Sequence, residues 1–255
     1  MGGGHAHPSG LHHPGDSVLH RLPAEAKVLA VLATILAVVA TPREAFWAFG
    51  LYLLLLVAIA VAARLPLRFI GRRIRIEVPF LAFALFLPIV GTDPRVDVLG
   101  VPLSEAGLWA GWNIAAKGTL GVLAAILLSA STPVVELLRG VERLRVPRVL
   151  VAIAGFMVRY LDVVTGEAGR MRVARISRGD DPRWIWQARA TAATAGTLFI
   201  RSYERGERVH LAMLARGYTG SMPEVHHHHP SAGAWWTAAL LPALAVGISV
   251  TAHVL

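Results

Sequence analysis

Two short arginine triplets carry the most specific chemistry in this sequence. One is Ser177-Arg178-Gly179 and the other is Ala215-Arg216-Gly217. In each, a small residue precedes the arginine and a glycine follows it. The guanidinium is a planar fork that holds a carboxylate through two hydrogen bonds, and small neighbours let a partner's backbone approach closely. The two triplets therefore predict two similar docking points for soluble partners.

A simpler interpretation of each triplet stays open. Arginines on solvated helices need no partner, and Gly179 and Gly217 are typical of the residue that follows the last turn of a helix. Taken singly, each triplet fits this interpretation as well as it fits docking. The recurrence of a small residue, an arginine and a glycine in the same order favours docking.

The composition predicts a membrane protein. Of the 255 residues, 55% are hydrophobic and only 16% are charged, against about 25% charged residues in soluble domains. The mean hydropathy is +0.56, and apolar blocks alternate with arginine-rich connections, as in polytopic proteins. The net charge of +9 lies in these connections. Positive loops that face an anionic inner leaflet explain it, so we expect no nucleic-acid partner.

We predict an all-α polytopic fold with about five membrane-spanning helices and a cytosolic helical region. Residues 1–23 form an N-terminal tail, residues 24–131 hold four spans, residues 132–231 form the cytosolic helical region, and residues 232–255 form the last span. The cytosolic helical region contains the apolar run Val149–Val158, which is too short to cross a bilayer alone.

The four predicted spans differ in length. They cover residues 24–41, 45–63, 78–90 and 105–131. The third covers only about 20 Å as a helix, so it must recruit flanking residues or lie among other helices.

The distribution of arginines predicts one orientation. The connection from residue 64 to residue 77 is the most basic and is therefore expected in the cytoplasm. This places the N-terminus and residues 132–231 on the cytoplasmic side, and the nearly neutral connections 41–44 and 92–104 outside. The arginines of the basic connection are Arg64, Arg68, Arg72, Arg73 and Arg75.

The surroundings of the second triplet resemble a known family. Residues 212–218 read Ala-Met-Leu-Ala-Arg-Gly-Tyr, which is similar to a coupling helix of the T component of energy-coupling-factor transporters, the CbiQ/EcfT family, and in particular its cobalt-transport Q subunit. That family carries an Ala-Arg-Gly signature on each of two cytosolic coupling helices. The first copy departs from it, with Ser177 in place of alanine. Residues 16–22 with Lys27, and residues 142–147 followed by Arg159-Tyr160, also resemble the family.

The resemblance implies a transmembrane coupling subunit of an ABC-type importer in a bacterial inner membrane, with a cytoplasmic N-terminus. The expected partners are two ATP-binding-cassette ATPases, which hold ATP-Mg, a substrate-binding membrane S subunit and the lipid bilayer. The chain itself is expected to bind no cofactor and to catalyse nothing. Cobalt or nickel is the expected cargo, and a vitamin is the alternative. The residues expected to contact the ATPases are Ser177, Arg178, Gly179, Ala215, Arg216 and Gly217.

Two clusters of histidines are weak candidates for a metal site. Imidazole suits cobalt, nickel, zinc and copper. Neither cluster has a helical i, i+4 pair followed by a third ligand, so we expect weak or incidental binding. The candidates are His5 and His7 near the N-terminus, and His226, His227, His228 and His229 before the last span.

Two other classes of function are considered. A secondary transporter with its own substrate site should show two related halves with interrupted spans, and we find no such repeat. A membrane-embedded enzyme should carry catalytic motifs, but there is no cysteine, no His-Glu-x-x-His and no Gly-x-Ser-x-Gly. A phosphate-binding loop needs lysine after glycine, whereas Lys27 and Lys117 both follow alanine.

Overall fold

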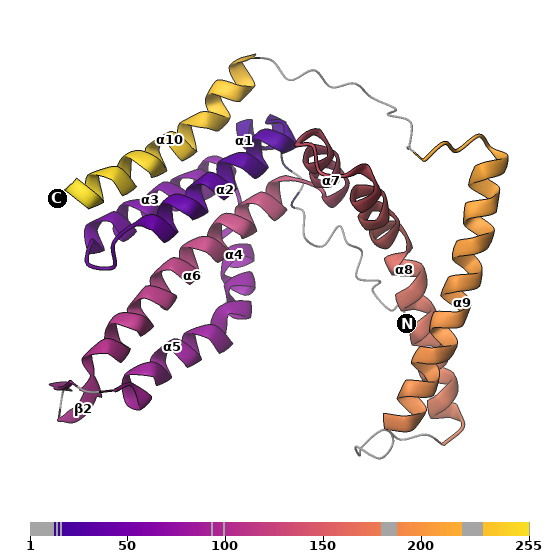
Figure 1. The fold of residues 1–255 in the computed structure, drawn as a ribbon, viewed down its shortest axis with the longest axis horizontal. Helices are drawn as coiled ribbons and strands as arrows, with labels where there is room; N and C mark the ends of the chain where they lie inside the picture. Colours follow the sequence, from indigo (N-terminus) through magenta and orange to yellow (C-terminus); the bar gives the residue numbers. More distant parts are fainter. Residues whose placement is uncertain are drawn as a thin grey trace. The chain divides into compact units, whose positions relative to one another are not determined.

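A computed structural model describes residues 13, 15, 17–92, 94–98, 100–179, 188–220 and 232–254. These residues are helical almost throughout (Figure 1), which confirms the all-α fold class. The chain divides into two compact units. We call residues 9–144 with 228–255 the span unit, and residues 145–227 with 1–8 the arm unit.

The span unit contains the five expected apolar helices. Of these, α6 and residues 233–254 of α10 are long and apolar enough to cross a membrane. The helices α2 and α3 have 17 residues each, or about 25 Å. A short helix, α1 (Val18–Arg21), precedes them. The five are α2 (Ala24–Ala40), α3 (Phe46–Ala62), α5 (Val78–Val90), α6 (Glu105–Ser131) and α10 (Ala232–Val254).

Two connections are more regular than the sequence indicates. The basic connection after α3 folds into a helix, α4 (Leu67–Ile74), and a 3-10 turn, η2 (Arg75–Glu77). The connection between α5 and α6 forms an antiparallel hairpin of β1 (Arg95–Val98) and β2 (Val101–Ser104). Gly100 turns this hairpin with φ +84°, a conformation that favours glycine.

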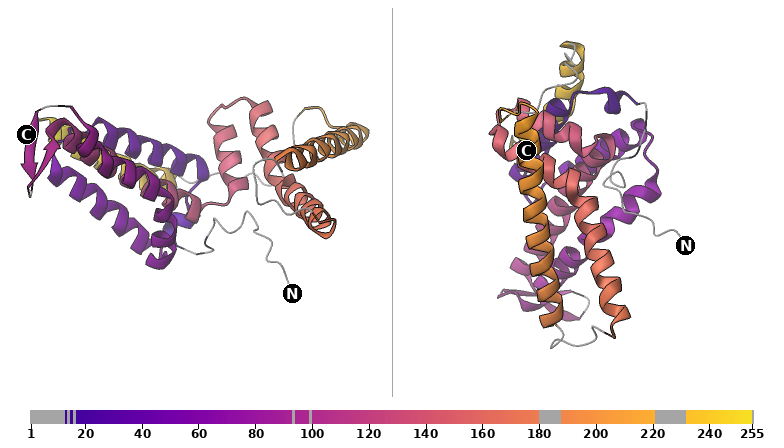
Figure 2. Two further views of the ribbon diagram at one scale, coloured as in Figure 1. Left: turned by 90° about the horizontal axis from the view of Figure 1, so that it is seen from below. Right: turned by 90° about the vertical axis from the view of Figure 1, so that its right-hand side faces the viewer.

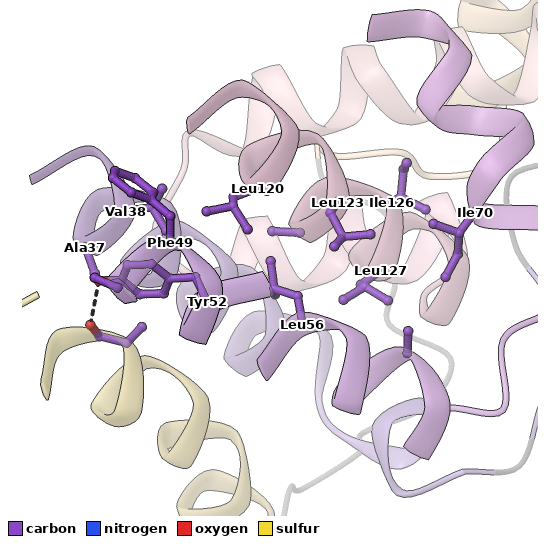
Figure 3. Packing of buried hydrophobic residues seen from close by; sticks show 14 of the residues in the cluster. Ala37, Val38, Phe49, Tyr52, Leu56, Ile70, Leu120, Leu123, Ile126 and Leu127 are labelled. Atoms are coloured by element: carbon purple, nitrogen blue, oxygen red, sulfur yellow. Dashed lines mark hydrogen bonds between the residues drawn. The ribbon is translucent and has the colours of Figure 1, made fainter. Parts of the chain in front are cut away.

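The core of the span unit forms among α2, α3, α6 and α10 (Figure 3), with α3 packed on α6 and α10, and α2 packed on α6 and α10. The ring of Tyr52 is fully buried. Its hydroxyl donates to the Ala245 carbonyl of α10 at 3.0 Å and lies 3.0 Å from Thr41 Oγ1. Because hydrocarbon offers no hydrogen bonds, a buried hydroxyl in a membrane helix must find such partners inside the protein.

The short helix α5 lies against α6 through small residues. Gly107 and Gly111 of α6 face Ala84 and Pro88 of α5, and a Cβ at Gly111 would lie 2.5 Å from the Ala84 carbonyl oxygen. Small residues let membrane helices approach closely and gain van der Waals contact. The 13-residue α5 thus lies against a longer helix, as expected for a span too short to cross the bilayer alone.

A polar network closes the end of α6. Lys27 of α2 is 3% exposed, and its Nζ donates to the Ser131 carbonyl at 3.2 Å and to Thr132 Oγ1 at 3.0 Å. A third bond reaches the His20 carbonyl at 3.2 Å, and the His13 amide donates to the Ala130 carbonyl at 2.9 Å. The last carbonyls of a helix have no partner within it. Here a cation and an amide supply those partners.

The next helix, α7 (Val134–Arg143), packs on the start of α2. Arg143 Nη1 lies 3.2 Å from Glu25 Oε1. A Cβ at Gly140 would lie 2.7 Å from the Glu25 amide nitrogen, so the two backbones touch. The span unit therefore extends through α7, which the sequence groups with the cytosolic region.

The arm unit consists of α8 (Arg148–Ser177) and α9 (Ala188–Ala215), which run in opposite directions (Figure 2). The ten-residue run Val149–Val158 is the start of the 30-residue α8. By length and composition α8 is also apolar enough to cross a membrane. Its location in the cytosol stays a prediction.

A carboxylate clamp joins α8 to α9. Arg201 Nη1 donates to Glu167 Oε1 at 3.0 Å, and Arg205 Nη2 donates to Glu167 Oε2 at 3.0 Å. The hydrogen bond from Arg201 and the charges of both arginines hold the pKa of the Glu167 carboxyl below its usual value. Nearer the end of α8, Arg175 Nη1 donates to Thr194 Oγ1 at 3.1 Å. These contacts fix where α9 lies along α8.

We expect Lys27→Met to destabilise the span unit, because the substitution leaves Ser131 and Thr132 without their donor. Hydrogen bonds to a charged group contribute about 1.5–3 kcal/mol, so we expect a loss of about 2 kcal/mol. The matched control is Lys117→Met, because among the described residues Lys117 makes a single hydrogen bond, to the Val39 carbonyl at 2.7 Å. Thermal unfolding in detergent measures both, and equal shifts would contradict the assignment.

We expect Glu167→Gln to loosen α8 from α9, because Arg201 and Arg205 lose their shared anion. The pKa of Glu167 is lower in the folded chain, so its contribution is complete above pH 4.5, the ordinary pKa, and is lost as the pH falls through the lowered pKa. Limited proteolysis at neutral pH should therefore cut the variant faster, with the difference fading in acid. The control is Glu204→Gln, whose pairing with Arg208 spans 4.0 Å within α9. A control as sensitive as Glu167→Gln would refute the clamp.

Candidate functional site

The first arginine triplet forms the end of α8. Ser177 is the last helical residue and Arg178 follows it as the cap. The Arg178 amide donates to the Arg175 carbonyl at 2.9 Å, and the Gly179 amide donates to the Ile176 carbonyl at 3.0 Å. Gly179 has φ +83°, where a side chain would be strained. The glycine therefore stops the helix directly after the arginine.

The second triplet forms the end of α9 in the same way. Ala215 is the last helical residue, and Gly217 has φ +81°. The Gly217 amide donates to the Leu214 carbonyl at 3.0 Å, and the Tyr218 amide donates to the Met213 carbonyl at 3.0 Å, which is the Schellman pattern of helix ends. The helix-end interpretation of both glycines is thus confirmed. It leaves docking by the arginines open.

All six residues of the two triplets are exposed. Among the described residues, the side chains of Arg178 and Arg216 have no ion pair and no hydrogen bond. Arg175, three residues before Arg178, behaves differently because it bonds to α9. The structure therefore leaves the two predicted guanidinium groups available to a partner.

The two triplets lie at opposite ends of the arm unit. Because α8 and α9 are antiparallel (Figure 2), the end of α8 lies beside the start of α9. The 28 residues of α9 then span about 40 Å. The structure thus does not bring the six predicted residues together. It presents two separate sites of similar local geometry, which suits two similar partners better than one.

The sequence did not reveal what holds the two sites apart. Glu167, Arg201 and Arg205 form the clamp, and nothing in their spacing pairs them, because the contact joins residues of two helices. The only signal is an acidic residue in the arginine-rich second half of α8. Toward the start of α8, an apolar cavity of about 520 Å³ lies between the helices, lined in part by Phe156 and Met213.

The predicted histidine clusters lie outside the described residues. Within the described part of the chain, no group of three His, Cys, Asp or Glu side chains could hold a metal ion. The clusters stay weak candidates. They are His5, His7, His226, His227, His228 and His229.

Comparison with known proteins matches this sequence to a transporter family. The CbiQ family, described as cobalt transport protein, matches residues 15–228. An energy-coupling factor transporter transmembrane protein EcfT from Bacillus selenitireducens is 29% identical over 83% of each chain. A cobalt transport protein CbiQ from Rhodobacter capsulatus is 28% identical over 64% of this chain and 65% of its own.

One relative is a longer, fused protein, and this chain is similar to only part of it. The putative fused cobalt transport protein CbiMQ from Methanocorpusculum labreanum is 26% identical over 83% of this chain, which spans only 37% of that protein's length. The apolar helices of the span unit and these similarities establish a membrane protein with a role in transport. The match over most of its length shows that the chain belongs to the CbiQ cobalt transport protein family.

Proposed function

We propose that this chain is the transmembrane coupling subunit of an energy-coupling-factor importer, and that Arg178 and Arg216 each dock onto an ATPase subunit. The observation that carries the proposal is the repeated geometry of the two helix ends. Each presents an exposed arginine immediately before a glycine with positive φ. The relatives named EcfT are transmembrane proteins of energy-coupling factor transporters, and this supports assembly into a complex of several subunits.

The arm unit is suited to transmit a force between two partners. Its docking sites are about 40 Å apart, and the clamp at Glu167 resists sliding of α8 along α9. When two ATPases change their separation, each arginine would carry the end of one helix with it. In this proposal the chain does mechanical work and its partners bind and hydrolyse ATP.

The motion would reach the spans through α7. The chain passes directly from α7 to α8 across residues 144–147, and α7 is fixed to the start of α2 by the Arg143–Glu25 pair and by contact at Gly140. A displacement of α8 would therefore pull on α2 and, through Lys27, on the end of α6. A separate membrane subunit would bind the substrate and respond to this displacement.

We propose cobalt or nickel as the cargo, with a vitamin as the alternative. Two relatives are named for cobalt transport, whereas others carry the general name EcfT. The coupling subunit need not touch the cargo. The test is to purify the chain with its partner subunits from cells grown with each candidate, and to assay which one is bound.

A transporter with its own cation site is less well supported. The span unit has a cavity of about 170 Å³ near Lys27, lined mostly by aliphatic side chains such as Leu56 and Leu127. Its only charged lining residue, Lys27, is cationic and donates to carbonyl groups. A divalent cation would meet repulsion there and few oxygen ligands, so this cavity does not fit that cargo.

The proposal requires the arm unit to face the cytoplasm. Reporter fusions after Gly71 and after Ser202 should both give a cytoplasmic signal, and a fusion after Val96 should give an external one. The physical reason is the concentration of arginines in residues 64–75, which favours the cytoplasmic side. An external signal at Ser202 would exclude docking to cytosolic ATPases.

We expect Arg178→Ala and Arg216→Ala each to weaken assembly with the ATPases. Removing one partner of a buried interfacial charge pair costs about 2–5 kcal/mol, so affinity should fall at least roughly thirtyfold at 1.4 kcal/mol per decade. Arg216→Ala should be the more damaging, because its triplet matches the family signature fully. Arg→Lys should rescue only in part, because lysine restores the charge without the fork. Pull-down with tagged ATPases measures the effect.

Matched controls separate specific docking from general attraction. Arg172 and Arg208 are exposed arginines of α8 and α9, and their alanine variants should assemble normally. If the controls weaken assembly as much as the triplet variants do, diffuse electrostatics explains the interaction. If none of the four variants changes assembly, the docking proposal is wrong.

A further inference from the structure

The helix α4 is amphipathic. Ile70 is buried in the core of the span unit, and Phe69 and Ile74 pack against that core. Arg68 and Arg72 are exposed. We propose that Arg68, Arg72 and Arg75 form a binding surface for the headgroups of anionic phospholipids, which we call the α4 surface.

The position of α4 places this surface at the level of the headgroups. The helix begins shortly after α3 ends and leads through η2 into α5. It also packs on α6, where Arg73 Nη1 lies 3.4 Å from Ser129 Oγ near the end of α6. The end of α3, the start of α5 and the end of α6 therefore all lie near α4. An amphipathic helix in this position lies where hydrocarbon gives way to water.

The charges of the α4 surface follow one helical face. Residues 68, 72 and 75 are separated by four and three positions, so their side chains lie along one stripe. In the part of the chain that the structure describes, none of Arg68, Arg72 and Arg75 has an ion pair. No Asp or Glu occurs from residue 45 to residue 76. The surface is therefore uniformly cationic.

The next carboxylate along the chain is buried and hydrogen-bonded elsewhere. Glu77 is only 2% exposed, and its Oε1 accepts a hydrogen bond from Thr119 at 2.8 Å. Guanidinium groups hold phosphate oxygens through paired hydrogen bonds. A phosphodiester in a neighbouring headgroup supplies the counter-charge that the protein itself does not.

Exposed apolar side chains favour a lipid over an acidic protein as the partner. Ile76 directly follows the stripe and is 75% exposed, and Phe80 is 67% exposed one turn further on. Side chains of this kind gain by insertion among acyl chains. A basic stripe beside such residues is typical of a helix that binds an anionic membrane surface.

A single fluorescent label can test the α4 surface, because the chain contains no cysteine. Gly71 is exposed, and a Cβ there would meet no atom within 4 Å, so Gly71→Cys should accept a bimane label. The labelled full chain is reconstituted in phosphatidylcholine vesicles with a minor share of phosphatidylglycerol. Brominated acyl chains are then placed on either lipid, in equal amounts, and quenching is compared. Brominated phosphatidylglycerol should quench more strongly, and added salt should reduce its advantage.

Substitution of the arginines should remove this preference. The triple change R68Q/R72Q/R75Q should lower the preference for phosphatidylglycerol at least about fivefold, the factor expected for even one arginine near an anionic surface. The triple change to Lys should retain most of it, because the charges remain. The matched control is R159Q/R170Q/R172Q, which removes three exposed arginines from α8 and should leave the preference intact.

Three results would overturn the proposal. They are equal quenching by the two lipids in the parent chain, an unchanged preference in the Gln triple variant, and an equal loss in the α8 control. The single substitution Arg72→Gln, which alters one exposed side chain, covers the case in which the triple variant does not insert. It should weaken the preference in the same direction, and an unchanged preference would count against the α4 surface.

Discussion

The junction around Lys27 is the interaction on which the rest of the structure depends. The last carbonyl groups of α6 have no partner within the helix and lie beside the buried residues Ser131 and Thr132, and Lys27 and the His13 amide satisfy them. The same ammonium binds Thr132 Oγ1, the residue that leads into α7. The buried Lys27 of α2 thus connects α2 to the end of α6 and to the residue that leads into α7. Glu25 and Gly140 extend that junction along α7.

In the arm unit, α8 and α9 hold the two arginine triplets apart without a large hydrophobic core. Many apolar side chains of α8 and α9 are exposed, including Met157 and Phe199, so burial alone does not set the position of one helix along the other. The bonds of Glu167 to Arg201 and Arg205 set it instead. Polar contacts of this kind have defined geometry, whereas apolar packing tolerates sliding. A fixed spacing between the two arginine triplets is therefore consistent with the proposed coupling function.

The sequence predicted the apolar helices well, because charges and prolines mark their ends. The predicted bounds of α5 and α6 agree with the structure, those of α2 differ by one residue at one end, and those of α3 differ by one residue at each end. The full length of α8 was missed, because Arg159 and Asp162 interrupt its apolar run. The helix α4 and the hairpin near Gly100 were also missed, since both were treated as plain connections. The triplets were found because they are local, but Glu167 and its partners were not, because pairing between helices leaves no periodic pattern.

The glycines at the two helix ends also affect the chain before any partner arrives. Gly179 and Gly217 stop each helix directly after its arginine, so each arginine stands at the C-terminal end of a helix, which is the negative pole of its dipole. A cation in that position is stabilised by about 0.3–1 kcal/mol. The dipole of each helix thus partly compensates the charge of the arginine at its end, whether or not a partner is bound. In the proposed docking, an arriving carboxylate meets the same negative pole, so the charge of the arginine must outweigh that repulsion.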